Sequence, residues 1–361
     1  MLVACASSTP IPAAIATIAS ELPSSPTPLA TTTRMPTPTP TETPTPQHTY
    51  QATAWMYYAG YAEQNAIQVN ADLLREANYF WYQLQPTCKI SGANQNPAAV
   101  AQDQQLGVRV VPSIMNSFDA KRLHTCLSEA EARSQHVQDL VKLVMDNNYD
   151  GIDIDYESMD PADREAFSLF IEQLAVSLHA QGKLLSVTVH AKTDDQGTWT
   201  GPRAQDWPRL GKAADEFKIM VYDYHSAAGE AGPIAPIEWA DQVIAYAQAT
   251  VPLEKVYLGI PFYGYDWVGK QAASQTWMGI QALIKRYNAE VQRDQDNEAW
   301  FTYDGGQQHT VRFADALTTR TKIEQIFKKY PQLAGVAIWY VNGEDPENWN
   351  VLRELFHNPA P

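Results

Sequence analysis

Residues 150–157 read Asp-Gly-Ile-Asp-Ile-Asp-Tyr-Glu, a stretch in which acidic residues alternate with isoleucine and tyrosine. A period of two is typical of a β-strand, whose successive side chains point to opposite faces. Asp153, Asp155 and Glu157 therefore share one face, and Asp150 falls outside this set, at the start of the strand. Desolvated carboxylates this close together cannot all be ionised, so at least one is expected to hold a proton at neutral pH. The stretch predicts acid–base chemistry at the end of a buried strand.

Further strands are predicted on both sides of this octet, alternating with helical patterns. One intervening helix has clear signals, with Asp160 as its N-cap, Pro161 at its first position and Gly182 after its end. Residues 128–131 read as a capping box for the helix before the octet. Eight strands and their helices over about 310 residues predict an α/β fold, a (β/α)8 TIM barrel. The predicted strands are 53–58, 79–84, 108–114, 151–156, 184–190, 217–224, 256–263 and 335–341.

The spacing is interrupted between the seventh and eighth predicted strands. Residues 276–294 read as a helix, and residues 300–313 as a hairpin that turns at Asp304-Gly305-Gly306. These patterns predict a small α+β insertion after strand 7, at residues 268–314, that would raise one wall of a cleft. The whole barrel domain is assigned to residues 49–361.

The first 48 residues differ in composition from the rest. They hold ten of the 24 prolines and only three charged residues, and they end in a run of alternating threonine and proline. Residues 1–48 are therefore predicted to be a disordered Pro/Thr-rich segment and linker. Leu2-Val3-Ala4-Cys5 resembles the end of a bacterial lipoprotein signal, with an incidental Cys5 as the alternative. We expect an extracellular or cell-surface protein, lipid-anchored through Cys5 if the first interpretation holds.

The net charge and the composition of the chain limit the classes of molecule that it is expected to bind. A net charge of −15 and a pI near 4.9 argue against nucleic acids and anionic membrane surfaces, and favour a neutral substrate. No apolar run is long enough to predict a membrane-spanning segment. Three cysteines without zinc spacing predict neither a metal site nor a disulfide scaffold, and Cys88 and Cys126 read equally well as a disulfide or as two thiols. We expect a monomer.

Candidate functional side chains gather near the carboxyl ends of the predicted strands, where barrel enzymes place their functional groups. Aromatic rings there can stack on the faces of sugars. The candidates are Met220, Tyr222 and Asp223 at the sixth strand, Tyr263 and Trp267 after the seventh, Trp339 in the eighth and Tyr57 in the first.

The octet matches, without departures, the D-G-x-D-x-D-x-E signature of family 18 glycoside hydrolases, the chitinases and their relatives. Met220-Val221-Tyr222-Asp223 is similar to the M-x-Y-D motif of that family, and Trp339 to the tryptophan that floors its sugar site. The resemblance covers residues 51–361. It implies a glycosidase of the chitinase or N-acetylglucosaminidase type.

The resemblance also implies a mechanism and a substrate. In this family the acetamido group of the substrate is the nucleophile, an oxazolinium ion is the intermediate, and the anomeric configuration is retained. Glu157 would protonate the leaving oxygen and later take a proton from water. Asp155 would hold the acetamido group, Asp153 would share its proton, and Tyr222 would hydrogen-bond the acetamido oxygen. The implied substrate is a β-1,4-linked glycan containing N-acetylglucosamine, with no metal or cofactor.

Other residues point to a branch of the family. Many members carry S-x-G-G after the third strand, but here the corresponding run is Val-Pro-Ser-Ile-Met-Asn-Ser, residues 111–117, so the grip on a chitin chain stays open. Residues 222–225 and 259–264 look more like spore-germination cortex-lytic N-acetylglucosaminidases, which act on peptidoglycan-type glycans. Chitin, peptidoglycan and N-linked glycans therefore stay open as substrates, as do exo and endo action.

A different class is the alternative: a non-hydrolytic, lectin-like glycan-binding protein of the same family. Such members usually lack the catalytic glutamate, and Glu157 is present here. We interpret His190 and His225 as packing or hydrogen-bonding residues, because no matching base or metal cluster accompanies them. The intact acidic octet favours the enzyme.

Overall fold

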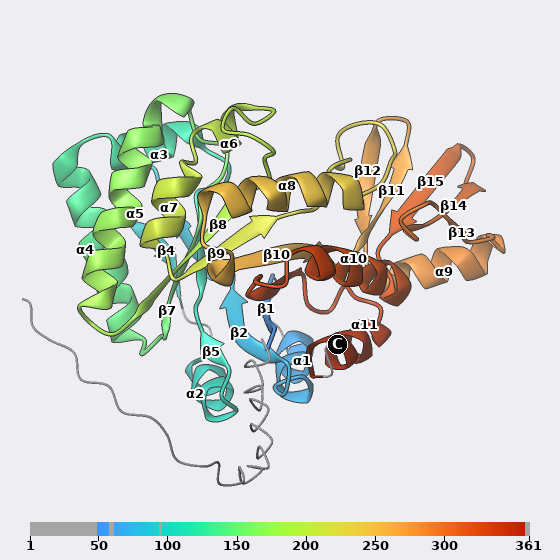
Figure 1. Cartoon of the computed structure of the whole chain (residues 1–361), viewed down its shortest axis with the longest axis horizontal. Helices are drawn as coiled ribbons and strands as arrows, with labels where there is room; N and C mark the ends of the chain where they lie inside the picture. Colours follow the sequence, from blue (N-terminus) through green and yellow to red (C-terminus); the bar gives the residue numbers. More distant parts are fainter. Residues whose placement is uncertain (1–48, 58–60, 94–95, 358–361) are drawn as a thin grey trace, which may run out of the picture. The chain divides into compact units, whose positions relative to one another are not determined.

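A computed structural model describes residues 49–57, 61–93 and 96–357. Contacts divide the chain into two units, Met1–Pro46 and Gln47–Pro361. Cys5 and the predicted linker lie outside the described residues, so lipidation and disorder of that segment stay predictions. Gln47–Pro361 is built around one parallel sheet that helices surround (Figure 1).

Within the described residues, eight strand positions form a closed ring, which confirms the predicted barrel. Two consecutive segments, 74–84 and 109–115, are each broken into two strands. The two segments pair with each other in two places, β2 with β5 and β3 with β6, and both pairs are parallel. These two pairs close the ring, and the other neighbouring strands of the ring are parallel as well. The positions are β1 (Gln51–Met56), β2 with β3 (Leu74–Tyr79, Tyr82–Leu84), β5 with β6 (Arg109–Val110, Ser113–Met115), β7 (Gly151–Asp155), β8 (Leu184–His190), β9 (Glu216–Met220), β10 (Val256–Pro261) and β16 (Gly335–Trp339).

The second strand position differs from the prediction of residues 79–84. The strand begins at Leu74. The prediction missed this start because two polar residues, Glu76 and Asn78, are buried inside the barrel and interrupt the hydrophobic pattern. Pro112 separates β5 from β6, since proline has no N–H to give to the ladder. A short strand, β4 (Ile90–Gly92), pairs antiparallel with β3 at the rim.

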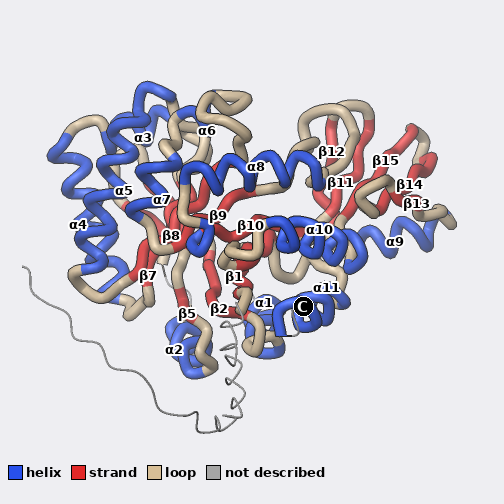
Figure 2. Tube along the Cα trace, in the orientation of Figure 1, coloured by secondary structure: helices blue, strands red, loops and turns tan. Residues whose placement is uncertain are grey.

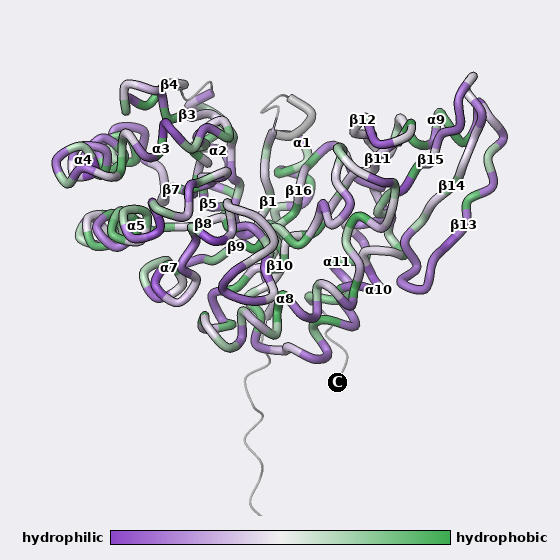
Figure 3. Tube along the Cα trace, turned by 90° about the horizontal axis from the view of Figure 1, so that it is seen from above, coloured by the Kyte–Doolittle hydropathy of each residue, from purple (hydrophilic) through white to green (hydrophobic). Residues whose placement is uncertain are grey.

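Helices enclose the strands, as Figure 2 shows in blue and red. In Figure 3, α4 and α5 carry both hydrophobic and hydrophilic residues, as expected of helices with one face on a sheet. No helix in the described part of the chain has the length and apolarity that a membrane crossing requires. The helices around the barrel are α1 (Tyr61–Val69), α2 (Pro97–Gln105), α3 (Ala120–Leu127), α4 (Ala130–Asp146), η1 (Pro161–Asp163), α5 (Arg164–His179), α6 (Thr200–Arg203), α7 (Trp207–Ala213), α8 (Ile237–Thr250), η2 (Leu253–Lys255), α10 (Ala316–Lys329) and α11 (Glu347–His357).

Of the two helices predicted from capping signals near the octet, one has the predicted ends and the other does not. The Asp160 side chain accepts a hydrogen bond from the Ala162 N–H, and Gly182 has a φ of +68°, as predicted for the two ends. The prediction of a capping box at residues 128–131 is wrong. Ser128 ends α3 instead, and α4 starts after Glu129, whose side chain makes no capping hydrogen bond.

The predicted α+β insertion follows β10. It begins at Gly264, where the chain enters an antiparallel sheet of order β12-β11-β15-β14-β13. Its helix ends at Tyr287 rather than at residue 294, because Asn288 adopts a left-handed conformation with a φ of +46°. Ile280, Phe301 and Val311 form part of a separate core. The elements are β11 (Gly264–Val268), β12 (Gln271–Gln275), α9 (Trp277–Tyr287), β13 (Gln292–Arg293), β14 (Ala299–Asp304) and β15 (Gln308–Phe313).

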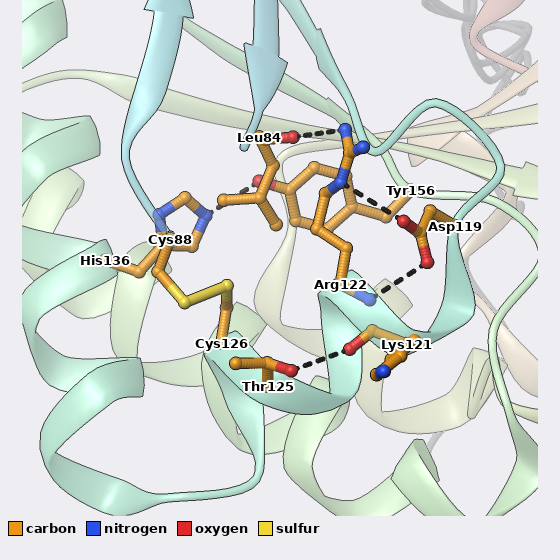
Figure 4. The surroundings of a disulfide bond; sticks show 9 residues. All are labelled: Leu84, Cys88, Asp119, Lys121, Arg122, Thr125, Cys126, His136 and Tyr156. Atoms are coloured by element: carbon orange, nitrogen blue, oxygen red, sulfur yellow. Dashed lines mark hydrogen bonds and ion pairs between the residues drawn. A yellow bond between two sulfur atoms is a disulfide. The ribbon is translucent and has the colours of Figure 1, made fainter. Parts of the chain in front are cut away.

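Cys88 and Cys126 form a disulfide, which settles the alternative that the sequence leaves open. The bond joins the turn between β3 and β4 to helix α3 (Figure 4). A second contact links the same elements, because Arg122 Nη1 donates to the Leu84 carbonyl at 2.6 Å. Helix α3 is thereby tied to the β3–β4 hairpin.

Candidate active site

Two cavities lie at the carboxyl ends of the barrel strands in the described part of the chain, and both are lined by Glu157. The larger has a volume of about 790 Å³ and the smaller about 510 Å³. Both fall in the range of small-molecule sites. Glu157 lies just past the end of β7, where the two cavities meet. The residues that line both are Phe118, Glu157, Met220, Tyr222 and Asp223.

Asp153 lies inside the barrel rather than in either cavity lining, and its side chain is fully buried. It is surrounded by four hydrogen-bond donors from three strands of the barrel, β1, β6 and β8. Such a set of donors replaces the hydrogen bonds to water that a carboxyl group loses on burial. The donors are Trp55 Nε1 at 3.2 Å, Ser113 Oγ at 2.7 Å, Ser186 Oγ at 2.6 Å and Thr188 Oγ1 at 3.1 Å.

A buried ammonium adds positive charge to this interior. Lys218 Nζ lies 3.9 Å from Asp153 Oδ1, 2.6 Å from Glu76 Oε1 and 3.6 Å from Glu216 Oε2. Burial alone would lower the pKa of Lys218, but these three carboxylates outweigh it and raise the pKa. Asp153 therefore keeps a positive neighbour as well as four donors.

Asp155 has the opposite surroundings. It lines the larger cavity, is 5% exposed, and its Oδ1 has no hydrogen-bond partner among the described residues. Burial raises the pKa of Asp155 well above its ordinary value, and the charges of Glu157 and Asp153 add to the rise. These surroundings therefore favour the protonated form of the Asp155 carboxyl.

Glu157 is balanced between its two protonation states. Burial, followed by the charge of Asp223, raises the pKa of Glu157 to about 7. Its Oε2 lies 3.5 Å from His190 Nε2, and burial lowers the pKa of His190 to about 3, so the imidazole stays neutral. A carboxyl with a pKa near the working pH can serve as both acid and base.

Three aromatic candidates border the larger cavity with Asp155. Tyr57 and Trp339 line it, with ring centres 5.7 Å apart, and Tyr57 is 47% exposed. The Tyr222 and Trp339 rings are nearly parallel, with an interplanar angle of 15°. Together these rings form an aromatic wall beside the two acids.

Tyr263 and Trp267 do not line either cavity, contrary to the substrate-binding prediction. Tyr263 is buried and its hydroxyl donates to Asp223, as does the hydroxyl of Tyr265 at 3.0 Å. Trp267 is buried too, and its Nε1 donates to the Ser226 carbonyl at 3.2 Å. The chain turns into the insertion at Gly264, which carries Trp267 away from the strand ends.

The smaller cavity contains residues that the sequence analysis did not single out. Trp199, Phe118 and Tyr224 are 41%, 66% and 52% exposed and present aromatic surface at its rim. They lie on loops without a periodic pattern, so only their position after a strand could have indicated them. Among the described residues, no group of three or more His, Cys, Asp or Glu side chains is arranged to hold a metal ion.

The barrel, its paired acids and its aromatic walls define the class of protein as a glycosidase. Residues 53–344 match Glycosyl hydrolases family 18, and the chain belongs to this family. Both the enzyme and the lectin-like alternative belong to this family, and the intact Glu157 favours the enzyme.

Three relatives illustrate the match. YdhD of Bacillus subtilis (strain 168), named as a sporulation-specific glycosylase, is 32% identical over 77% of this chain and 68% of its own length. A cortical fragment-lytic enzyme of Bacillus anthracis is 27% identical over 71% of this chain, which spans only 61% of that protein. The crystal structure of a chitinase from Chromobacterium violaceum superposes with a TM-score of 0.77 at 28% identity, over 84% of this chain and 98% of the chitinase. The relatives include the cortex-lytic branch, which confirms the resemblance.

Proposed function

We propose that this enzyme cleaves β-1,4-linked glycans containing N-acetylglucosamine by a retaining, substrate-assisted reaction. The observation that carries the proposal is the position of Glu157, a carboxyl with a pKa of about 7 at the junction of two cavities. A sugar in the larger cavity and a leaving sugar in the smaller one would place the glycosidic oxygen beside Glu157. General acid catalysis requires this placement.

The surroundings of the other carboxylates support a nucleophile on the substrate. The raised pKa of Asp155 disfavours the carboxylate form that a nucleophile requires, and Asp153 is enclosed inside the barrel. Asp223 is engaged by the hydroxyls of Tyr263 and Tyr265. A 2-acetamido oxygen on the bound sugar supplies the missing nucleophile, which is the route known for this family.

The acetamido oxygen bonds to the anomeric carbon while the glycosidic bond breaks and Glu157 gives its proton to the leaving oxygen. An oxazolinium ion forms on the sugar in the larger cavity. Water then attacks the anomeric carbon, gives a proton to the Glu157 carboxylate, and reopens the ring with the original configuration.

Neighbouring residues take supporting roles in this proposal. Tyr222 donates to the acetamido oxygen, Asp155 accepts the acetamido N–H, and Trp339 stacks on the sugar face. Asp153 acts through its charge, which favours the protonated form of Asp155. This replaces the predicted sharing of a proton, because the described hydrogen bonds of Asp153 come from Trp55 and three hydroxyls.

The proposed substrates are chitin oligosaccharides or peptidoglycan, in line with the names of the relatives. We also propose that the enzyme acts outside the cytoplasm, at or beyond the cell surface. The Cys88–Cys126 disulfide supports this location, since such bonds persist in oxidising compartments.

Glu157→Gln tests the assignment, with Glu230→Gln on the exposed surface as its control. Both variants are incubated with chitooligosaccharides, purified peptidoglycan and N-glycans, and products are read by mass spectrometry. We expect Glu157→Gln to lose at least about 10³-fold in turnover while still binding ligand, and the control to match the parent. Equal turnover in all three proteins would remove Glu157 from its role.

A further inference from the structure

The segment between β6 and α3 departs from the S-x-G-G pattern of the family and lies directly against Glu157. In the paired strands Ser113 is opposite Asp153, and Ser113 Oγ donates to Asp153 at 2.7 Å. Ser113 therefore occupies the serine position of the pattern. Met115 and Asn116 stand where the pattern has its two glycines.

The Asn116 side chain pairs with the backbone of Glu157 on both sides. The Glu157 N–H donates to Asn116 Oδ1 at 2.9 Å, and Asn116 Nδ2 donates to the Glu157 carbonyl at 2.6 Å. Strand β7 ends at Asp155, so this pair continues the ladder past the end of the strand. Asn116 is 1% exposed and borders the larger cavity, and both hydrogen bonds are partly buried.

The segment that carries Asn116 is itself held in an unusual conformation. Ser117 and Phe118 have φ values of +56° and +57°, in the left-handed region that non-glycine residues rarely occupy. Asp119 follows and accepts from the Arg122 N–H at 3.1 Å, as the N-cap of α3. Helix α3 is tied to the β3–β4 hairpin through Arg122 and through Cys126 (Figure 4).

We propose that Asn116 is the positioning residue for the proton donor. Its amide fixes the backbone of Glu157 just after the strand and so holds the Glu157 carboxyl at the junction of the two cavities. The disulfide-braced helix α3 supports Asn116 in turn. The inference rests on the proposed function, in which Glu157 protonates the leaving oxygen.

If Asn116 positions the proton donor, the effect of replacing Asn116 on the cleavage rate should depend on the leaving group of the substrate. A departing sugar oxygen needs a proton, whereas a dinitrophenolate leaves as a stable anion without one. Displacing the proton donor by a fraction of an ångström therefore slows cleavage between sugars and spares the activated substrate. A residue that only stabilised the fold would affect both substrates alike.

Asn116→Ala is measured on chitotetraose and on the 2,4-dinitrophenyl β-glycoside of chitobiose. We expect kcat/KM to fall about 30-fold on chitotetraose, with KM changed less than about twofold, and to fall less than about threefold on the dinitrophenyl substrate. Asn147→Ala is the matched control, because Asn147 Nδ2 also bonds a backbone carbonyl, that of Leu143 at 2.9 Å, after α4. It should leave both rates unchanged.

An equal fall on the two substrates, or no fall on either, overturns the positioning role. A parent enzyme that cleaves neither substrate would instead count against the proposed function. If Asn116→Ala does not fold, Asn116→Asp replaces it. Aspartate keeps the acceptor for the Glu157 N–H and loses the donor to its carbonyl, so the same leaving-group dependence is expected with a smaller fall.

Discussion

Asp153 and Asp155 are two residues apart on one strand, yet they lie in opposite environments. The interior around Asp153 offers four hydrogen-bond donors and the Lys218 ammonium. The cleft around Asp155 leaves its Oδ1 without a partner among the described residues and places a second acid, Glu157, nearby. The same residue type is thus enclosed by hydrogen-bond donors in one place, and in the other its pKa is raised by burial and by neighbouring acids.

Within the octet, Asp153 therefore has a structural role and Asp155 has a chemical one. A buried carboxyl group that accepts hydrogen bonds from several strands holds those strands together. Carboxyls in a partly satisfied, desolvated cleft have raised pKa values and are able to transfer protons. The environment, rather than the residue type, assigns the roles.

Removal of the buried cation should produce the largest effect. Lys218→Met removes the cation beside Asp153 and leaves Glu76 and Glu216 with Arg109 alone, so we expect a loss of about 3–5 kcal/mol in the free energy of unfolding. Urea unfolding followed by tryptophan fluorescence measures the change. Lys142→Met on the exposed face of α4 should change stability by less than about 1 kcal/mol. A similar small change for Lys218→Met would show that the interior does not depend on the cation.

Asp155→Asn tests the other side of the comparison. We expect kcat to fall about 10²-fold, because an amide is a weaker acceptor than a carboxyl group for the acetamido N–H as positive charge develops. The free energy of unfolding should stay within about 0.5 kcal/mol of the parent. Turnover assays and thermal unfolding are run on the same preparation. A large loss of stability would mean that Asp155, like Asp153, is part of the structural interior.

A smaller effect is expected on the pH dependence. The kcat/KM of the parent should fall as the pH rises through about 7, because Glu157 must start protonated. The charge of Asp223 raises the pKa of Glu157, so Asp223→Asn should lower that pKa and move the alkaline limb to lower pH by about half a unit. A limb that stays in place or moves upward in the pH–rate profile would contradict this coupling.

The strand periodicity of the octet and the helix signals around it were enough to predict the barrel. They also placed Asp155 and Glu157 beside Tyr222 and Trp339, because the carboxyl ends of parallel strands meet at one edge. These features are local in sequence or follow from the symmetry of the fold.

The features that were missed depend on tertiary contacts. Glu76 made β2 look unlike a strand, although Lys218, distant in sequence, neutralises it inside the barrel. Tyr263 and Trp267 follow a strand as predicted, but both are buried, with hydrogen bonds to Asp223 and to the Ser226 carbonyl, and neither lines the cavities. Asn116 gave no signal of its own, since its partner is the backbone of Glu157 on the adjacent strand position.

The nucleophile on the substrate is the central claim, and it can be tested by weakening that nucleophile alone. The rate is compared for two dinitrophenyl β-glycosides of chitobiose that differ only in carrying an N-acetyl or an N-trifluoroacetyl group on the cleaved sugar. Fluorine withdraws electrons from the carbonyl oxygen, so the account predicts that kcat/KM falls at least about 100-fold with the fluorinated substrate. Equal values for the two substrates would contradict it and would return the nucleophile to a carboxylate of the protein.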